Sequence, residues 1–229
     1  MRTQFTKLTA IFLAIFAIAA YAENAEQLKT TINNFVGCTG NLTSTVSANT
    51  VNITDSLKCT NNKILTLNID SNTRVVWKAH LIGNVPNELI VKKGKGVLEI
   101  QSGSIKNSIT NSLYNAIRID EGDLVISGGE ISAGGGYGVK NNSAGSVTIT
   151  GGEIKMEGTG SIAVYNTSTG TVNISGGTIR GYYAIYNTST GTININGGEI
   201  SGSNKTVYCV SSGTCGKVNI SPPAKITSK

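Results

Sequence analysis

The strongest constraint on the fold is a short sequence unit that recurs along the second half of the chain. Residues 146–154, 171–179 and 192–200 each contain two aliphatic residues separated by a small polar one, then a Gly-Gly pair and an isoleucine, and residues 124–131 are a weaker copy. The Gly-Gly pairs begin at positions 128, 151, 176 and 197, so they lie 23, 25 and 21 residues apart. A period in this range predicts a stacked repeat architecture.

The residues inside one repeat predict short strands. Val147 and Ile149 alternate with Thr148 and Thr150, which is the period-two pattern of a strand with one buried face. A repeat of this length holds about three short strands and no crossover helix, whereas a propeller blade needs about 40 residues. The Leu and Asn signature of a leucine-rich repeat is absent. We therefore expect an all-β, single-domain parallel β-helix.

Aliphatic residues at near-repeat spacing extend the pattern through residues 45–229. The expected inward positions are Ile53, Val76, Ile100, Ile126, Ile149, Ile174, Ile195 and Ile220. They predict about eight coils and a rod on the order of 35–40 Å long, since strands of successive coils lie ~4.8 Å apart.

The first residues predict export. Residues 1–22 contain Arg2 and Lys7, an apolar run from Ile11 to Ala20 and the small residues Ala20 and Ala22, as in a secretory signal peptide. The run is shorter than the ~20 residues of a membrane span. We expect a protein that is secreted, to the cell surface or the periplasm, with no membrane insertion after signal removal.

Residues 23–44 are expected to cap the N-terminal end of the rod. In a helix over Glu23–Phe35, the side chains of Leu28, Ile32 and Phe35 would form one apolar stripe. An uncapped solenoid exposes its core and its unpaired strand edges, so this helix would cover them.

The chain has four cysteines, Cys38, Cys59, Cys209 and Cys215. An even number in a secreted chain predicts disulfides. Proximity in the sequence favours the pairs Cys38–Cys59 and Cys209–Cys215. A zinc site is disfavoured, because its ligands would come from both ends of the rod and the chain has one histidine.

Two columns of equivalent residues accompany the Gly-Gly corners. Asn141, Asn166 and Asn187 each lie ten residues before a Gly-Gly pair, so we expect a structural ladder of stacked amides. In the last repeat Cys209 takes the place of the asparagine.

The second column contains Tyr165, Tyr186 and Tyr208, with Lys140 at this position in the preceding coil. We expect these side chains to point outward, next to small outward residues: Gly138, Ala163, Ala184 and Thr206. Exposed rings on a flat sheet are a platform for sugar rings; the alternative is that they stack on one another and support the rod.

A further outward surface is rich in amides and hydroxyls. It comprises Thr148, Thr150, Asn173, Ser175, Asn194, Asn196, Asn219 and Ser221. Asn173 and Asn194 are its candidate contacts for sugar hydroxyls, and an ordinary solvated sheet face is the alternative.

Acidic residues are sparse, which disfavours catalysis. Glycoside hydrolysis needs two carboxylates ~5–10 Å apart, and the one acidic cluster is Asp120, Glu121 and Asp123 on a single loop. We expect no catalytic residues and no cofactor; Asp120 and Asp123 are the candidates for a calcium site. Without Arg2 and Lys7 the chain has 17 basic and 13 acidic residues, a net charge of +4, and we expect no nucleic-acid partner.

The repeated Val-x-Ile-x-Gly-Gly-x-Ile unit with its Tyr-Asn turn resembles the β-helix proteins of the pectate-lyase-like superfamily, over roughly Val97 to Ile220. The resemblance is closest to secreted, non-catalytic carbohydrate-binding members, and it implies a right-handed helix. The clustered aspartates and the basic residue of the lyases find no matching positions, so lyase activity is not implied.

These features favour a secreted module that binds extracellular or cell-wall polysaccharide. A structural or adhesive surface rod and a polysaccharide lyase are the alternatives. The oligomeric state does not follow from the sequence.

Overall fold

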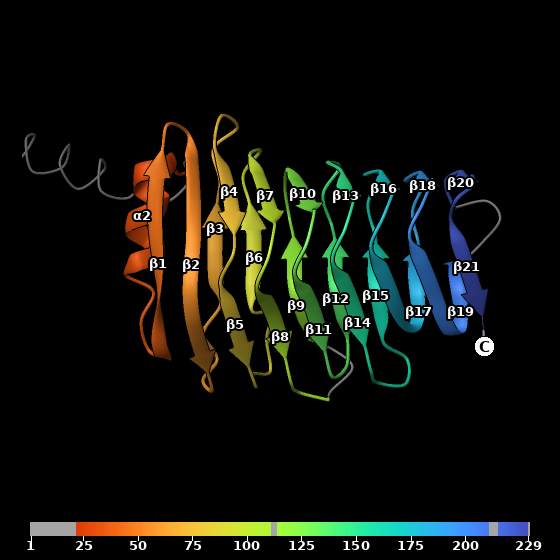
Figure 1. Cartoon of the computed structure of the whole chain (residues 1–229), viewed down its shortest axis with the longest axis horizontal. Coiled ribbons are helices and arrows are strands. Elements are labelled where there is room, and N and C mark those ends of the chain that lie inside the picture. Colours follow the sequence, from red (N-terminus) through yellow and green to blue (C-terminus); the bar gives the residue numbers. More distant parts are fainter. Residues whose placement is uncertain (1–21, 111–113, 211–214, 229) are drawn as a thin grey trace, which may run out of the picture.

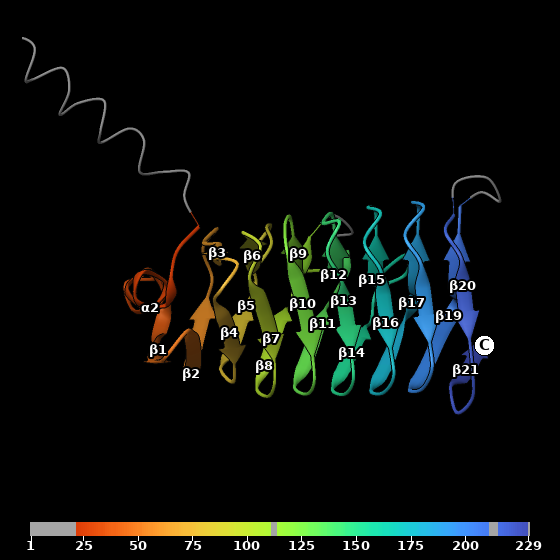
Figure 2. The ribbon, with the colours of Figure 1, turned by 90° about the horizontal axis from the view of Figure 1, so that it is seen from above.

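The computed structural model describes residues 22–110, 114–210 and 215–228. These residues form a right-handed parallel β-solenoid of about seven turns with one short helix at its N-terminal end (Figure 1). The coils follow one another along the long axis in sequence order (Figure 2). Residues 1–21 of the predicted signal peptide lie outside the described residues.

Three faces run along the solenoid, and each is a ladder of parallel strands. Face 1 has eight rungs. They are the first half of β2 (Thr50–Cys59), β4 (Arg74–Trp77), β7 (Val97–Ile100), β10 (Asp123–Ile126), β13 (Val147–Ile149), β16 (Val172–Ile174), β18 (Ile193–Ile195) and β20 (Val218–Ile220).

Face 2 also has eight rungs, whereas face 3 has seven. Face 2 comprises the second half of β2, β5 (His80–Gly83), β8 (Ser104–Asn107), β11 (Glu130–Ala133), β14 (Glu153–Met156), the first parts of β17 (Thr178–Asn187) and β19 (Glu199–Cys209), and β21 (Lys225–Ser228). Face 3 comprises β3 (Leu65–Asn68), β6 (Ile90–Lys93), β9 (Asn115–Ile119), β12 (Tyr137–Asn141), β15 (Ile162–Asn166) and the second parts of β17 and β19.

The N-terminal end is covered by a helix and a hairpin. Helix α2 (Ala25–Asn33) begins at a capping box between Asn24 and Gln27, and it is shorter than the predicted Glu23–Phe35. β1 (Thr39–Ser47) pairs antiparallel with β2, so it is not part of a parallel coil. Ala48, in the turn between them, has a left-handed φ of 51°. Because β1 pairs with the edge of β2, the first coil is not left as an open edge.

The core is a stack of aliphatic side chains. The predicted inward isoleucines from Ile53 to Ile195 are at most 1% exposed, whereas Ile220 in the last rung is 54% exposed. The prediction that Val76 is the inward residue of its coil was wrong. Trp77 takes this position, because it lies in register with Ile53 and Ile100. Three consecutive apolar residues, 75–77, leave the alternation ambiguous in the sequence. The buried indole N–H of Trp77 donates to the carbonyl of Ala79 at 2.8 Å.

The Gly-Gly corners need glycine for two separate reasons. The second glycine of each pair is left-handed, with φ of 75° at Gly152 and 78° at Gly177. The first glycine packs against the coil below, because a Cβ at Gly151 would lie 2.4 Å from the carbonyl oxygen of Ser127. Any other residue would push the coils apart.

The inner amide ladder is present on face 3. The side chain of Asn141 donates to Asn166 at 2.9 Å, and that of Asn166 donates to Asn187 at 3.1 Å. All three are fully buried. The Asn166 amide also donates to the carbonyls of Ser168 and Gly170, so the ladder satisfies the turn backbone as well as the neighbouring coil.

Both predicted disulfides are confirmed, Cys38–Cys59 and Cys209–Cys215. Cys209 lies in register with Asn187, as the sequence predicts. The Asn187 amide donates to Cys215 Sγ at 3.5 Å, so the disulfide closes the inner ladder at its C-terminal end.

A lysine occupies the same inner column two coils before Asn141. Lys92 lies in register with Leu67 and Ile119, is fully buried, and donates through Nζ to the turn carbonyls of Gly94 and Glu121. Burial lowers the pKa of Lys92 to about 8, although Asp123 and Glu121 act to raise it. Sequence reasoning missed this residue, because a lysine among polar residues is ordinarily expected on the surface.

The amide ladder predicts a large stability loss on truncation of Asn166. Asn166→Ala leaves several buried groups without partners, each costing ~1–3 kcal/mol, so we expect the free energy of unfolding to fall by about 3 kcal/mol. Chemical denaturation measures it. Asn173→Ala is the control, since Asn173 is only half-buried and accepts one amide bond; its loss should be below about 1 kcal/mol. Equal losses would contradict the structural role of the inner ladder.

The buried ammonium predicts a rise of stability with pH. The folded pKa of Lys92, about 8, lies below the ordinary 10.5, so between these values the folded state binds fewer protons than the unfolded state. The free energy of unfolding should therefore increase from pH 8 to 9.5, by roughly 2 kcal/mol. Urea titrations over this range measure the slope. Lys92→Met should lack this contribution, and the same slope in both proteins would overturn the assignment.

Candidate functional site

The predicted tyrosine column lies on face 3. Lys140, Tyr165, Tyr186 and Tyr208 are successive register partners on β12, β15, β17 and β19, which stand side by side in Figure 1. The side chains are half-buried. The ring centroids of Tyr165 and Tyr186 are 5.3 Å apart and nearly perpendicular, and those of Tyr186 and Tyr208 are 4.9 Å apart.

Three more tyrosines extend this column into a cluster. Tyr137 lies 4.8 Å from Tyr165, and Tyr183 lies 5.2 Å from Tyr186, centroid to centroid. Tyr182 contacts Tyr183 at 4.9 Å. We refer to these six residues as the tyrosine cluster: Tyr137, Tyr165, Tyr182, Tyr183, Tyr186 and Tyr208.

The additional rings arise from an irregularity that the sequence pattern hides. Ile162 pairs with Tyr183 and Val164 pairs with Ile185, while the intervening Ala163 and Ala184 are left out of the ladder. In a regular strand, Tyr183 and Tyr186 would point to opposite faces of the sheet, because they are three residues apart. The irregularity brings both rings to the outer face. Ile162, the register partner of Tyr183, is itself buried.

The prediction that small residues flank the tyrosines on the outer surface was wrong. Ala163 and Ala184 are fully buried, and Thr206 is 6% exposed. Gly138 is also buried, and a Cβ there would lie 2.8 Å from Ile154 Cγ2, in the interior. Only small residues fit there, because the position faces the core at a corner; the tyrosines are instead flanked by other rings.

Two lysines supply positive charge to the tyrosine cluster. Lys140 Nζ lies 5.8 Å and 6.0 Å from the ring centroids of Tyr137 and Tyr165, and Lys205 Nζ lies 4.4 Å from that of Tyr208. These are cation–π distances. Burial raises the pKa of Tyr137 and of Tyr186, and neighbouring tyrosines add to both shifts. Both hydroxyls therefore remain neutral hydrogen-bond donors near pH 7.

The candidate amides on the other surface bond to one another. Asn173, Asn194 and Asn219 are register partners on face 1. The side chain of Asn194 donates to Asn173 at 2.8 Å, and that of Asn219 donates to Asn194 at 2.7 Å. Since this outer amide ladder engages Asn173 and Asn194, the tyrosine cluster is the better candidate for ligand contact.

The candidate calcium ligands are held by protein donors. Asp120 accepts hydrogen bonds from Arg118 at 3.0 and 3.2 Å. Asp123 accepts from the backbone N–H of Ser146 at 2.6 Å and from its hydroxyl at 2.9 Å. Across residues 22–110, 114–210 and 215–228, no three His, Cys, Asp or Glu side chains are grouped to hold a metal.

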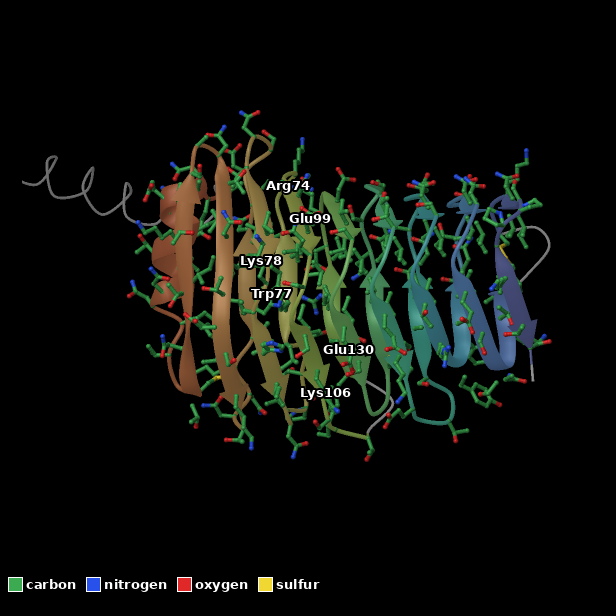
Figure 3. All side chains as sticks on the ribbon, viewed as in Figure 1. Arg74, Trp77, Lys78, Glu99, Lys106 and Glu130 are labelled. Carbon is green, nitrogen blue, oxygen red and sulfur yellow. A yellow bond between two sulfur atoms is a disulfide. The ribbon has the colours of Figure 1, made fainter. Side chains whose placement is uncertain are left out.

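A separate ionic cluster lies on face 1. Glu99 is 7% exposed and accepts hydrogen bonds from Arg74 and Ser127. Figure 3 labels Glu99 on β7, Arg74 on the neighbouring β4 and Lys78 directly after β4. Burial acts to raise the pKa of Glu99, but hydrogen bonds from Ser127 and Arg74 and the charges of Arg74 and Lys78 outweigh it and lower the pKa. The Glu99 carboxylate therefore has hydrogen-bond donors within the protein, from Arg74 and Ser127.

Comparison with known proteins gives no relative: no protein-family model matches the chain, and neither a curated protein nor a solved structure is significantly similar to it. In the described part of the chain, no helix is long and apolar enough to span a membrane.

Proposed function

We propose that this protein is a secreted, non-catalytic β-helix protein of the pectate-lyase-like type that binds an extracellular or cell-wall polysaccharide through the tyrosine cluster. The observation that carries the proposal is the continuity of the rings. Six half-buried tyrosines contact one another across four successive coils of face 3, and so follow the long axis of the rod.

The chemistry of the cluster suits a saccharide chain. Tyrosine offers a flat apolar face and a polar hydroxyl, and the C–H faces and hydroxyl groups of a sugar ring are complementary to both. Lys140 and Lys205 add ammonium donors at two places along the cluster. The two disulfides are consistent with an oxidising, extracellular environment.

The second candidate function is a structural or adhesive rod without a sugar site. The same ring contacts and the two amide ladders favour it, because they tie each coil to the next. The two functions differ in whether the rings contact a ligand or only one another.

A polysaccharide pull-down separates them. We expect the protein to be retained by at least one insoluble polysaccharide of a panel, and Tyr165→Ala with Tyr186→Ala to weaken retention by about tenfold or more, as loss of central aromatic contacts does. Tyr114→Ala, a tyrosine outside the cluster, is the matched control and should bind as the wild type does. Wild-type retention in the double variant, or no retention on any polymer, would favour the rod.

A further inference from the structure

A hollow lies where the chain leaves face 2 for face 3, and none of its described lining residues belongs to the tyrosine cluster. The chain passes from β11 to β12 through residues 134–136, whereas it uses residues 157–161 to pass from β14 to β15 in the next coil. The turn after β11 is therefore shorter than the turn after β14. The resulting notch has a volume of about 690 Å³ and is lined by β8, β11, β14 and the described residues that follow them, a size typical of ligand pockets.

Three consecutive glycines make the short turn possible. A Cβ at Gly134 would lie 2.9 Å from the carbonyl oxygen of Ile109. Gly136 has a left-handed φ of 63°, and a Cβ there would lie 2.0 Å from the carbonyl oxygen of Tyr114. The depth of the notch thus depends on residues that cannot carry side chains.

The floor of the notch holds a hydroxyl without a partner. Ser132 lies in the outward column between Lys106 and Lys155 and is 7% exposed. Its Oγ has no hydrogen-bond partner within the described residues. A buried hydroxyl without a partner costs free energy, and a ligand that supplies the missing bond recovers it.

The charges around Ser132 are balanced but only partly paired. Lys155 Nζ bonds to Glu157 at 2.9 Å, and this bond raises the pKa of Lys155. Lys106 and Glu130, labelled in Figure 3, have no ion-pair partner within 4.0 Å among the described residues. They are diagonal neighbours on adjacent parallel strands, so a rise of about 3.3 Å per residue and a strand spacing of ~4.8 Å place their Cα atoms roughly 8 Å apart.

From this arrangement we propose that the notch binds a small zwitterion, an amino acid or a short peptide. The ligand's carboxylate contacts Lys106 Nζ and the Ser132 hydroxyl, and its ammonium group contacts Glu130. A simple anion would face Glu130 and Glu157, and a simple cation would face Lys106 and Lys155, so neither is matched by the balanced charge. The proposal is independent of the polysaccharide function, because none of these residues belongs to the tyrosine cluster.

An NMR titration of the full-length protein tests the notch directly. The probes are alanine, lactate, which has a hydroxyl in place of the ammonium group, and ethylamine, which lacks the carboxylate. We expect alanine to shift the amide signals of Ser132 and Gly134 with a Kd at least about tenfold lower than either analogue. Alanyl-alanine is the further probe. Tighter binding of alanine than of alanyl-alanine indicates a free amino acid as the ligand, and tighter binding of alanyl-alanine indicates a short peptide.

Matched variants locate the binding. Lys106→Gln and Glu130→Gln should each weaken alanine binding by about tenfold or more, and Ser132→Ala by several-fold. Lys58→Gln, in the same outward column two coils away, and Tyr165→Ala should leave binding unchanged. Equal binding of alanine and lactate, an equal loss in Lys58→Gln, or no shift with any probe would overturn the proposal.

Discussion

The whole molecule depends on one arrangement: each coil is joined to the next by parallel backbone hydrogen bonds, so residues one repeat apart are vertical neighbours. This register forces equivalent side chains into contact with their own copies. A buried asparagine must then bond to the asparagine above it, and a corner must be glycine wherever the coil below comes too close. The inner amides, the corners and the aliphatic core are thus three consequences of the same vertical spacing.

The same register gives the outer surface its possible functions. One tyrosine in a repeat becomes a row of contacting rings once the repeat is stacked, and a local irregularity at Ala163 and Ala184 adds a second ring to the row. The notch has a different origin, namely a difference in length between turns of successive coils. Where Gly134 to Gly136 make a shorter turn than residues 157–161 of the next coil, the otherwise regular rod has a pocket. Repetition therefore builds the extended surface, and departure from repetition builds the local site.

Periodicity predicted the architecture, the inner amides and the tyrosine column, because each of these depends only on which residues are one repeat apart. The two disulfides were predicted instead from the even number of cysteines and their proximity in the sequence. Periodicity failed where a residue's direction depends on local geometry. Three apolar residues in a row hid the inward role of Trp77, and the interrupted pairing at Ala184 hid the outward role of Tyr183. Lys92 was missed for another reason: only the folded chain shows that its ammonium group reaches buried turn carbonyls. The antiparallel β1 was also unforeseen, since nothing in the repeat marks its reversal at Ala48.

The vertical register is tested most directly by engineered cross-linking on face 2. Glu153 and Thr178 are register partners on β14 and β17, and adjacent strands lie ~4.8 Å apart, which is within the Cα separation that a disulfide spans. The double variant Glu153→Cys, Thr178→Cys should therefore form an intramolecular disulfide under mild oxidation, detected by the mass of linked peptides. Pairing Glu153→Cys with Arg180→Cys, a diagonal neighbour, should link far more slowly. Equal rates for the two pairs, or no link in the first, would contradict the stacked register on which the tyrosine cluster and the notch both depend.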